Sequence, residues 1–278
     1  MTILLFSVLT GIGAFAAGLL GALTGLGGAI IITPLLTIVF GVDIRYAIGA
    51  SLVSVIATSS GAAAAYVREG YTNVRVGMLL EIATTIGALA GAYLAGHVTT
   101  SALAVIFGLV LLYSGYRSTK PLAEHVTTEH ADPIAVKLRL NSAYPTPAGM
   151  QPYAVQHVPA GFSLMFGAGI LSGLLGIGSG AVKVLAMDQA MRLPFKVSTT
   201  TSNFMIGVTA AASAGVYLHR GYIDPGIALP VMLGVLAGAL TGARILTGAR
   251  PQSLRILFSI VVLVLAAEML YKGLTGAL

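Results

Sequence analysis

The chain is 278 residues long, with 56% hydrophobic and only 9% charged residues, whereas a soluble domain is usually nearer a quarter charged. It contains no cysteine, which excludes disulfides, thiolate metal sites and cysteine nucleophiles. Its net charge of +6 comes from lysines and arginines that lie between apolar runs, without the basic patch and interleaved aromatics typical of a nucleic-acid-binding protein.

Apolar segments, most of them about as long as membrane-spanning helices, follow one another along most of the chain. They cover residues 3–23, 29–41, 47–67, 76–96 and 101–117, and then 160–177, 180–191, 197–218, 226–247 and 252–271. None alternates with the period of two that lipid-exposed strands require. The sequence therefore predicts an all-α membrane protein, with transmembrane repeats at 1–117 and 159–278 and a solvated linker or small cap at 118–158.

The two halves repeat each other at an offset of 151 residues. This offset aligns Gly18 with Gly169, Ser51 with Ser202, and Tyr71 in a Gly-Tyr turn with its counterpart in the second half. The matches gather at glycines and polar positions, which are less interchangeable than aliphatic ones. We therefore expect two homologous halves with about five apolar segments each, or eight to ten membrane segments in all.

The second apolar segment of each half is short, and the basic residues indicate whether it crosses the bilayer. Its twelve or thirteen residues rise about 20 Å, less than the ~30 Å hydrocarbon core. If it counts as a crossing, the basic residues between segments lie on one side, except Arg45, Arg220 and Lys272. The positive-inside rule prefers this count. An odd number of crossings per half predicts an inverted-topology repeat, with the termini outside and the linker cytoplasmic.

Each short segment begins at a glycine-rich break, GLGG at residues 25–28 and GIGSG at residues 176–180. Paired interruptions in an inverted repeat indicate a substrate site near the midplane. The helices that start there present free backbone N–H groups and partial positive charge, which favour an oxyanion. The predicted substrate site therefore includes Gly25, Gly27, Gly28, Gly176, Gly178, Ser179 and Gly180.

Lys183 lies just after the second break, in an apolar segment where a charged side chain is costly and by default functional. We include it in the predicted site. Its partner is either Asp188 in a structural ion pair or a bound anion, and snorkelling to an interface is a third possibility. Glu81 is a lone carboxylate that could carry a proton, although the alternative is a pairing with Arg75 or Arg68.

Three further polar residues complete the predicted site, namely Ser51, Ser202 and Asn203. Their side chains can donate hydrogen bonds to the oxygens of a bound anion. Hydrogen bonding between helices explains them equally well, because serine and asparagine do this routinely in membranes. The spacings Gly87-x3-Gly91 and Gly238-x3-Gly242 indicate close helix packing, within the chain or in a homodimer.

Four sequence features together resemble the sulfite exporter TauE/SafE family: the repeated glycine break, IGASLVSVIATSSGA, its partner TTTSNFMIGVTAAASAGVY, and the turn RGYIDP. The resemblance covers nearly all of the chain outside the linker. It implies a multi-pass prokaryotic plasma-membrane permease that moves small sulfur-containing oxyanions outward, such as sulfite, sulfoacetate or a related organosulfonate. The glycines of both breaks and Pro34 match the family's pattern. Ser179 and Leu185 depart from it, which bears on the substrate more than on the fold.

These features together predict a secondary transporter that exports a small oxyanion by alternating access, with no ATP, cofactor or metal. A passive channel for small anions is the alternative, because the sequence does not distinguish the two. No HExxH motif or Ser–His–Asp set supports an enzyme. The expected partners are the anionic substrate, membrane lipid and a second copy of the chain, with no nucleic acid.

Overall fold

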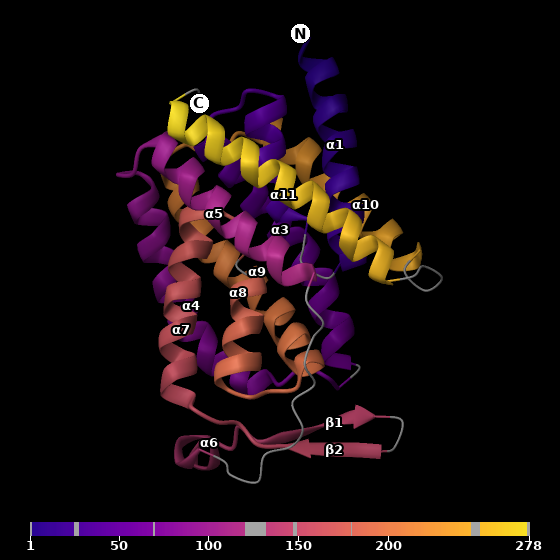
Figure 1. The fold of residues 1–278 in the computed structure, drawn as a ribbon, viewed down its shortest axis with the longest axis vertical. Helices are drawn as coiled ribbons and strands as arrows, with labels where there is room; N and C mark the ends of the chain where they lie inside the picture. Colours follow the sequence, from indigo (N-terminus) through magenta and orange to yellow (C-terminus); the bar gives the residue numbers. More distant parts are fainter. Residues whose placement is uncertain are drawn as a thin grey trace.

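The computed structural model describes residues 2–24, 28–68, 70–119, 132–146, 149–178, 180–245 and 251–276, which are almost entirely helical (Figure 1). The first half forms α1 (Ile3–Thr24), α2 (Ala29–Pro34) with the π-helical turn η1 (Leu35–Val39), α3 (Ile44–Arg68), α4 (Val74–Ala95) and α5 (Thr100–Thr119). The second half forms α7 (Val158–Leu175), α8 (Gly180–Leu185) with η2 (Ala186–Ala190), α9 (Phe195–His219), α10 (Pro225–Ile245) and α11 (Pro251–Thr275). Every apolar segment predicted from the sequence therefore coincides with a helix.

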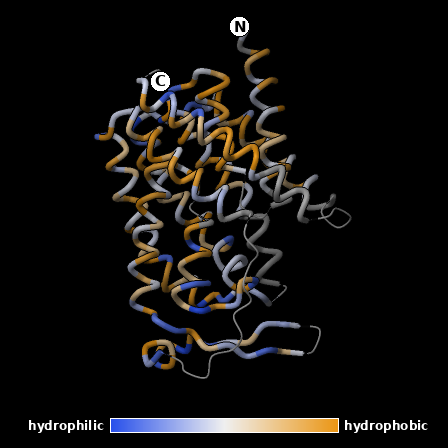
Figure 2. Tube along the Cα trace, viewed as in Figure 1, coloured by the Kyte–Doolittle hydropathy of each residue, from blue (hydrophilic) through white to orange (hydrophobic). Residues whose placement is uncertain are grey.

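Within the described ranges, four helices are long and apolar enough to cross a bilayer, namely α1, α4, α7 and α10, and shorter apolar stretches lie in α2–η1, α3 and α5. On α4, Met78, Ile82 and Ile86 share one helical face and are 63%, 56% and 55% exposed. Such an apolar stripe is costly in water and fits contact with lipid. Figure 2 shows hydrophobic residues throughout the helical bundle and more hydrophilic ones along the β-hairpin at its end, which is formed by Ser142–Thr146 and Gly149–Tyr153.

Glycines bring two pairs of helices into close contact, α1 with α10 and α4 with α7. A Cβ atom on Gly18 of α1 would lie 2.3 Å from the carbonyl oxygen of Val235 in α10. A Cβ atom on Gly169 of α7 would lie 2.2 Å from the carbonyl oxygen of Thr84 in α4. The two contacts correspond under the 151-residue offset, so both helix pairs pack in the same way.

The small-xxx-small spacing on α4 serves this internal packing. Cβ atoms on Gly87 and Gly91 would lie 2.2 Å and 2.1 Å from the carbonyl oxygens of Phe166 and Ile170 in α7. Gly238 of α10 has the same relation to α1, with a carbonyl oxygen 2.1 Å from its Cβ position. Close packing is therefore confirmed for these three glycines.

The direction of each helix follows from its contacts at the two ends of the bundle. The hairpin marks one end and both chain termini lie at the other (Figure 1). Both α4 and α7 begin at the hairpin end: Asn73, just before α4, donates its side-chain amide to the linker carbonyl of Leu140, and the N–H of Val158 donates to Asp132 in the linker. Arg220, just before α10, instead contacts the last turn of α4. Thus α1 and α7, which correspond in the sequence, begin at opposite ends.

The linker forms a short helix, α6 (Pro133–Lys137), and an antiparallel hairpin of β1 (Ser142–Thr146) and β2 (Gly149–Tyr153). The strands were not predicted from the sequence, because Pro145 and Pro152 argue against an internal strand. Both strands of a two-stranded sheet are edge strands, however, so each proline can face away from its partner. Asn73 fixes the hairpin to the bundle by donating to the hydroxyl of Tyr153 at 2.9 Å.

Basic residues occupy both ends of the bundle, and two of them form matching contacts. The Arg45 guanidinium lies 5.8 Å from the ring centroid of Tyr222, and the Lys196 ammonium lies 3.9 Å from that of Tyr71. The two pairs correspond under the 151-residue offset. Arg220 and Lys272 lie at the Arg45 end, and Arg75, Lys137, Arg139 and Arg192 lie at the hairpin end.

Candidate functional site

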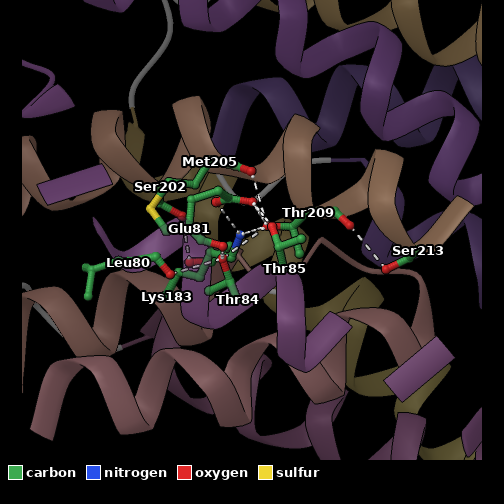
Figure 3. A network of polar contacts seen from close by, with 10 residues as sticks. Leu80, Glu81, Thr84, Thr85, Lys183, Ser202, Met205, Thr209 and Ser213 are labelled. Atoms are coloured by element: carbon green, nitrogen blue, oxygen red, sulfur yellow. Dashed lines mark hydrogen bonds and ion pairs between the residues drawn. The ribbon is translucent and has the colours of Figure 1, made fainter. Parts of the chain in front are cut away.

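A buried cluster of charged and hydroxyl side chains lies where α4, α8 and α9 meet (Figure 3). Lys183 of α8 is 0% exposed, and its Nζ lies 3.9 Å from Oε2 of Glu81 on α4. The same ammonium donates a hydrogen bond to Oγ1 of Thr209 on α9. Thr209 in turn donates to Oε1 of Glu81 at 2.7 Å. One hydroxyl therefore bridges the two charges and ties three helices together.

The carboxylate of Glu81 is held mainly through one of its two oxygens. Oε1 also accepts a hydrogen bond from Thr85 at 3.1 Å. Oε2 accepts none from the described residues and faces Lys183. Removing two charges from water costs several kcal/mol for each ion, and their mutual attraction must offset this cost. At 3.9 Å the ion pair is longer than a charge-assisted hydrogen bond of about 2.7–2.9 Å, so the two charges neutralise each other without a direct bond.

The ion-pair partners of Lys183 and Glu81 in this cluster differ from those predicted from the sequence. The structure gives Lys183 a partner from another helix, Glu81, which the spacing along the chain did not indicate. Snorkelling is wrong, since the side chain of Lys183 is fully buried. The predicted Glu81–Arg75 pair is also wrong, because Arg75 donates to the carbonyl of Arg139 at 3.0 Å. The side chain of Arg68 lies outside the described residues.

The second glycine break is a left-handed turn at the end of α7. Gly176 and Gly178 have φ angles of 67° and 68°, which disfavour residues with a side chain. Ser51 of α3 places its hydroxyl 3.0 Å from the carbonyl oxygen of Gly176 and 3.2 Å from that of Ala29, the first residue of α2. The end of α7 and the start of α2 therefore lie close together beside α3. Of the first break, Gly25 and Gly27 lie outside the described residues.

The first residues of α8 and α2 each accept a hydrogen bond from a serine of the long helix that follows. Ser202 of α9 donates to the carbonyl of Gly180 at 3.2 Å, and this bond corresponds to the Ser51–Ala29 bond under the 151-residue offset. A serine hydroxyl has one proton to donate. Both serines use it on backbone carbonyls, which favours the interhelical interpretation of their role. A direct contact with substrate stays a prediction for both.

The remaining predicted site residues lie around the same helices. Gly28 packs against α1, where its Cβ position is 3.0 Å from the Cα atom of Gly18. A Cβ atom on Gly180 would lie 2.8 Å from the side chain of Ile206 on α9. Asn203 is partly exposed beside Ser202, and Ser179 lies outside the described residues. The described members of the predicted site thus lie on α3, α8 and α9, at the end of α7 and just before α2, but the threonines and the carboxylate of the buried cluster were not among them.

One sequence signal could have linked the two charges of the cluster. The offset places Ile32 opposite Lys183 and Met232 opposite Glu81. Each charge thus appears in one copy of the repeat, Glu81 in the first and Lys183 in the second, at a position where the other copy is apolar. Two charges that depart together from a repeat are good candidates for a compensating pair, since an unpaired charge inside a membrane is costly.

The chemistry of the cluster suits the binding of small charged solutes. It offers an ammonium, a carboxylate and hydroxyl groups deep between helices, beside backbone that lacks side chains. Among the described residues, no group of three or more His, Cys, Asp or Glu side chains could hold a metal ion. An ammonium group can bind an anion and a carboxylate can bind a proton, so both kinds of ligand fit the chemistry of this cluster.

Comparison with known proteins identifies the family. The chain matches the family model described as sulfite exporter TauE/SafE over residues 10–269. It is 28% identical over 267 residues to the probable membrane transporter protein YunE of Bacillus subtilis (strain 168), which covers 93% of this chain and 95% of that protein.

Two further relatives cover similar shares. A probable membrane transporter protein of Xylella fastidiosa (strain 9a5c) is 28% identical over 266 residues, covering 95% of this chain and 93% of that protein. The probable membrane transporter protein MJ0441 of Methanocaldococcus jannaschii is 26% identical over 270 residues, covering 92% of each chain. No solved structure matches the chain significantly. The chain is therefore a multi-pass membrane transporter, not an enzyme, and it belongs to the sulfite exporter TauE/SafE family.

Proposed function

We propose that this protein is a secondary transporter that exports a small sulfur-containing oxyanion by alternating access. The carrying observation is Lys183, a fully buried ammonium placed three residues after the break that ends at Gly180. A charge at this depth is costly and by default marks a substrate or ion site. Sulfite, sulfoacetate and related organosulfonates are anions small enough to lie beside backbone that carries no side chains.

The Lys183 ammonium has N–H donors available to bind such an anion. A lysine side chain carries three N–H donors. Among the described residues, its one hydrogen-bond acceptor is the hydroxyl of Thr209, and Glu81 at 3.9 Å is too far for a direct hydrogen bond. The two remaining N–H groups can bind two oxygens of a tetrahedral or pyramidal oxyanion.

The two halves are proposed to form an inverted-topology repeat. Three observations support this proposal. The residues that form the glycine contact between α1 and α10 map onto those that form the contact between α4 and α7 under the 151-residue offset. The serine bonds to the starts of α2 and α8 map onto each other in the same way. The equivalent helices α1 and α7 begin at opposite ends of the bundle. Alternating access in such folds is a rocking of one repeat against the other around a fixed site.

The hairpin end is proposed to face the cytoplasm, with both termini outside. Arg75, Lys137, Arg139, Arg192 and Lys196 belong to the hairpin end. Arg45, Arg220 and Lys272 belong to the other end. The excess of basic residues in short cytoplasmic loops favours this orientation in a prokaryotic plasma membrane.

Transport is tested by reconstituting the full chain in liposomes loaded with sulfite or sulfoacetate and following efflux. We expect efflux from wild-type vesicles and its loss in the Lys183→Met variant, which keeps the length of the side chain without its charge. Lys196→Met is the matched control, because Lys196 lies over Tyr71 at the end of the bundle. If neither anion moves, or if Lys183→Met transports at the wild-type rate, the proposed function is wrong.

A passive anion channel is the competing function, and the same vesicles distinguish it. A transporter accelerates labelled-anion uptake when unlabelled anion is present on the opposite side, because the loaded carrier reorients. A channel shows no such counter-transport, and it conducts fast enough for single-channel current steps. Current steps without counter-transport would replace the transporter proposal with the channel.

A further inference from the structure

We propose that Glu81 is a proton-binding site of the transport cycle, so that one proton binds together with each anion. This inference rests on the proposed function, since it assigns the coupling of the same site. It starts from the ion pair between Glu81 and Lys183, in which a single ammonium balances a single carboxylate.

The anion and the Glu81 carboxylate compete for one positive charge. While Glu81 is ionised, the pair is neutral, and an added anion would leave a net negative charge buried in a medium of low dielectric. When Glu81 takes up a proton, Lys183 is left without a counter-ion, and the anion supplies one. When one anionic group, such as a sulfonate, pairs with Lys183, either state keeps the paired groups of the cluster neutral, so protonation of the carboxylate favours the anion and the anion favours protonation.

Few other charged groups face Glu81, so Lys183 and Glu81 are the groups that couple anion binding to protonation. In the described residues, α7 carries no titratable side chain, and α9 carries Lys196 and His219 only near its ends, with Tyr217 bonded to carbonyls of α7. On α4 itself, Arg75 lies six residues before Glu81 and bonds to the linker. The nearest other carboxylate along α8–η2 is Asp188, five residues after Lys183.

The geometry also provides a place for the proton on the Glu81 carboxylate. Oε1 of Glu81 accepts bonds from Thr209 and Thr85, while Oε2 accepts none from the described residues. A proton on Oε2 leaves both threonine bonds intact. The Glu81 side chain is 13% exposed, although its Oε2 atom is buried, whereas the side chain of Lys183 is 0% exposed. Solvent therefore reaches the Glu81 side chain more readily than the lysine, and a proton needs only a small movement of the carboxylate to bind Oε2.

In the binding step, the Glu81 carboxylate, a proton and a free anion give a neutral carboxyl group and an anion paired with Lys183. No covalent bond other than the O–H bond changes. With a divalent substrate such as sulfoacetate, one turnover moves two negative charges and one proton, a net charge of minus one. Because the membrane potential is negative inside, it still drives this complex outward.

Proton uptake on binding is the direct test, with the full chain in detergent and sulfoacetate as the probe. Its carboxyl group titrates near pH 4 like other carboxylic acids, so its charge is constant between about pH 6 and 8.5. A pH-indicator dye in weakly buffered solution should report one proton taken up per anion bound. Calorimetry should show the affinity falling about tenfold per pH unit on the alkaline side, the slope for one coupled proton.

The Glu81→Gln variant mimics the protonated carboxyl and should bind sulfoacetate with a pH-independent affinity and no proton uptake. Glu268→Gln, on α11, is the matched control and should behave like wild type. A carbonyl band of a protonated carboxyl group should also appear in the infrared difference spectrum of wild-type protein on binding, which keeps the test decisive if Glu81→Gln does not fold.

The outcomes separate the two proposals. Binding without proton uptake, or loss of uptake in Asp188→Asn instead of Glu81→Gln, overturns the role of Glu81 and leaves the anion transporter standing. If sulfoacetate binds to neither wild type nor Glu81→Gln, and sulfite efflux is also absent, the proposed function fails and this inference fails with it.

Discussion

Replacing Thr209 with valine tests the buried cluster most sharply, because valine keeps the shape of threonine and removes its hydroxyl. That hydroxyl accepts a hydrogen bond from Lys183 and donates one to Glu81. The side chain is fully buried, so water cannot take the place of the lost bonds. Both charges would stay in the membrane with less support.

The expected cost follows from the kind of bonds that are lost. A hydrogen bond to a charged group contributes about 1.5–3 kcal/mol. Glu81 keeps its bond from Thr85, and the ammonium can move toward the carboxylate from its distance of 3.9 Å. We therefore expect Thr209→Val to lower the free energy of unfolding by about 2–3 kcal/mol rather than by the sum of both bonds.

The control is Ser213→Ala, one turn further along α9. Ser213 donates to the carbonyl of Thr209 within its own helix. Because even hydrogen bonds between helices average only about 0.6 kcal/mol in a membrane bundle, we expect Ser213→Ala to cost no more than this. Reversible unfolding in mixed detergent micelles measures both variants. A Thr209→Val effect no larger than that of Ser213→Ala would refute the claim that this hydroxyl bridges the buried charges.

Three further predictions concern packing, the linker and orientation. Gly87→Ala should lower the free energy of unfolding by about 1–3 kcal/mol, because its Cβ would lie 2.2 Å from a carbonyl oxygen of α7. Gly215→Ala is the control and should be neutral or stabilising, because nothing lies within 4 Å of its Cβ position. Tyr153→Phe should lower the free energy of unfolding by about 1 kcal/mol, because the hydrogen bond from Asn73 is lost. Burial also raises the pKa of Tyr153. The free energy of unfolding of the wild type should therefore fall above about pH 10, and that of the variant should fall less. Since the chain has no cysteine, His97→Cys should react with an impermeant maleimide on intact cells and Lys196→Cys only after permeabilisation, and the reverse pattern would contradict the proposed orientation.

The sequence was sufficient to predict the helices and the break that follows α7. Apolar run length predicted each helix, since a helix in lipid must satisfy its own backbone. The glycines at 176 and 178 predicted the turn after α7, because only glycine adopts its positive φ angles at low cost. The close approach of α4 to α7 at Gly87 and Gly91 was indicated by the small-xxx-small spacing of these glycines.

The partner of Lys183 could not be predicted from local spacing. Asp188 is the carboxylate within reach along the segment, whereas Glu81 lies on another helix and becomes a neighbour only when α4 packs against α9. The hairpin was missed for a related reason: Pro145 and Pro152 disfavour a strand unless one of its edges is open. The first error concerns a contact that depends on how the helices pack, and the second concerns a sheet in which both strands have an open edge.

The most direct test of the central claim is a structure with a bound substrate analogue. Selenite has the shape and charge of sulfite, and selenium gives an anomalous signal that locates it without ambiguity. We predict an anomalous peak close enough to Nζ of Lys183 for a hydrogen bond, with the carboxylate of Glu81 displaced from its 3.9 Å approach. A peak at another site, with the Lys183–Glu81 pair unchanged, would contradict the account.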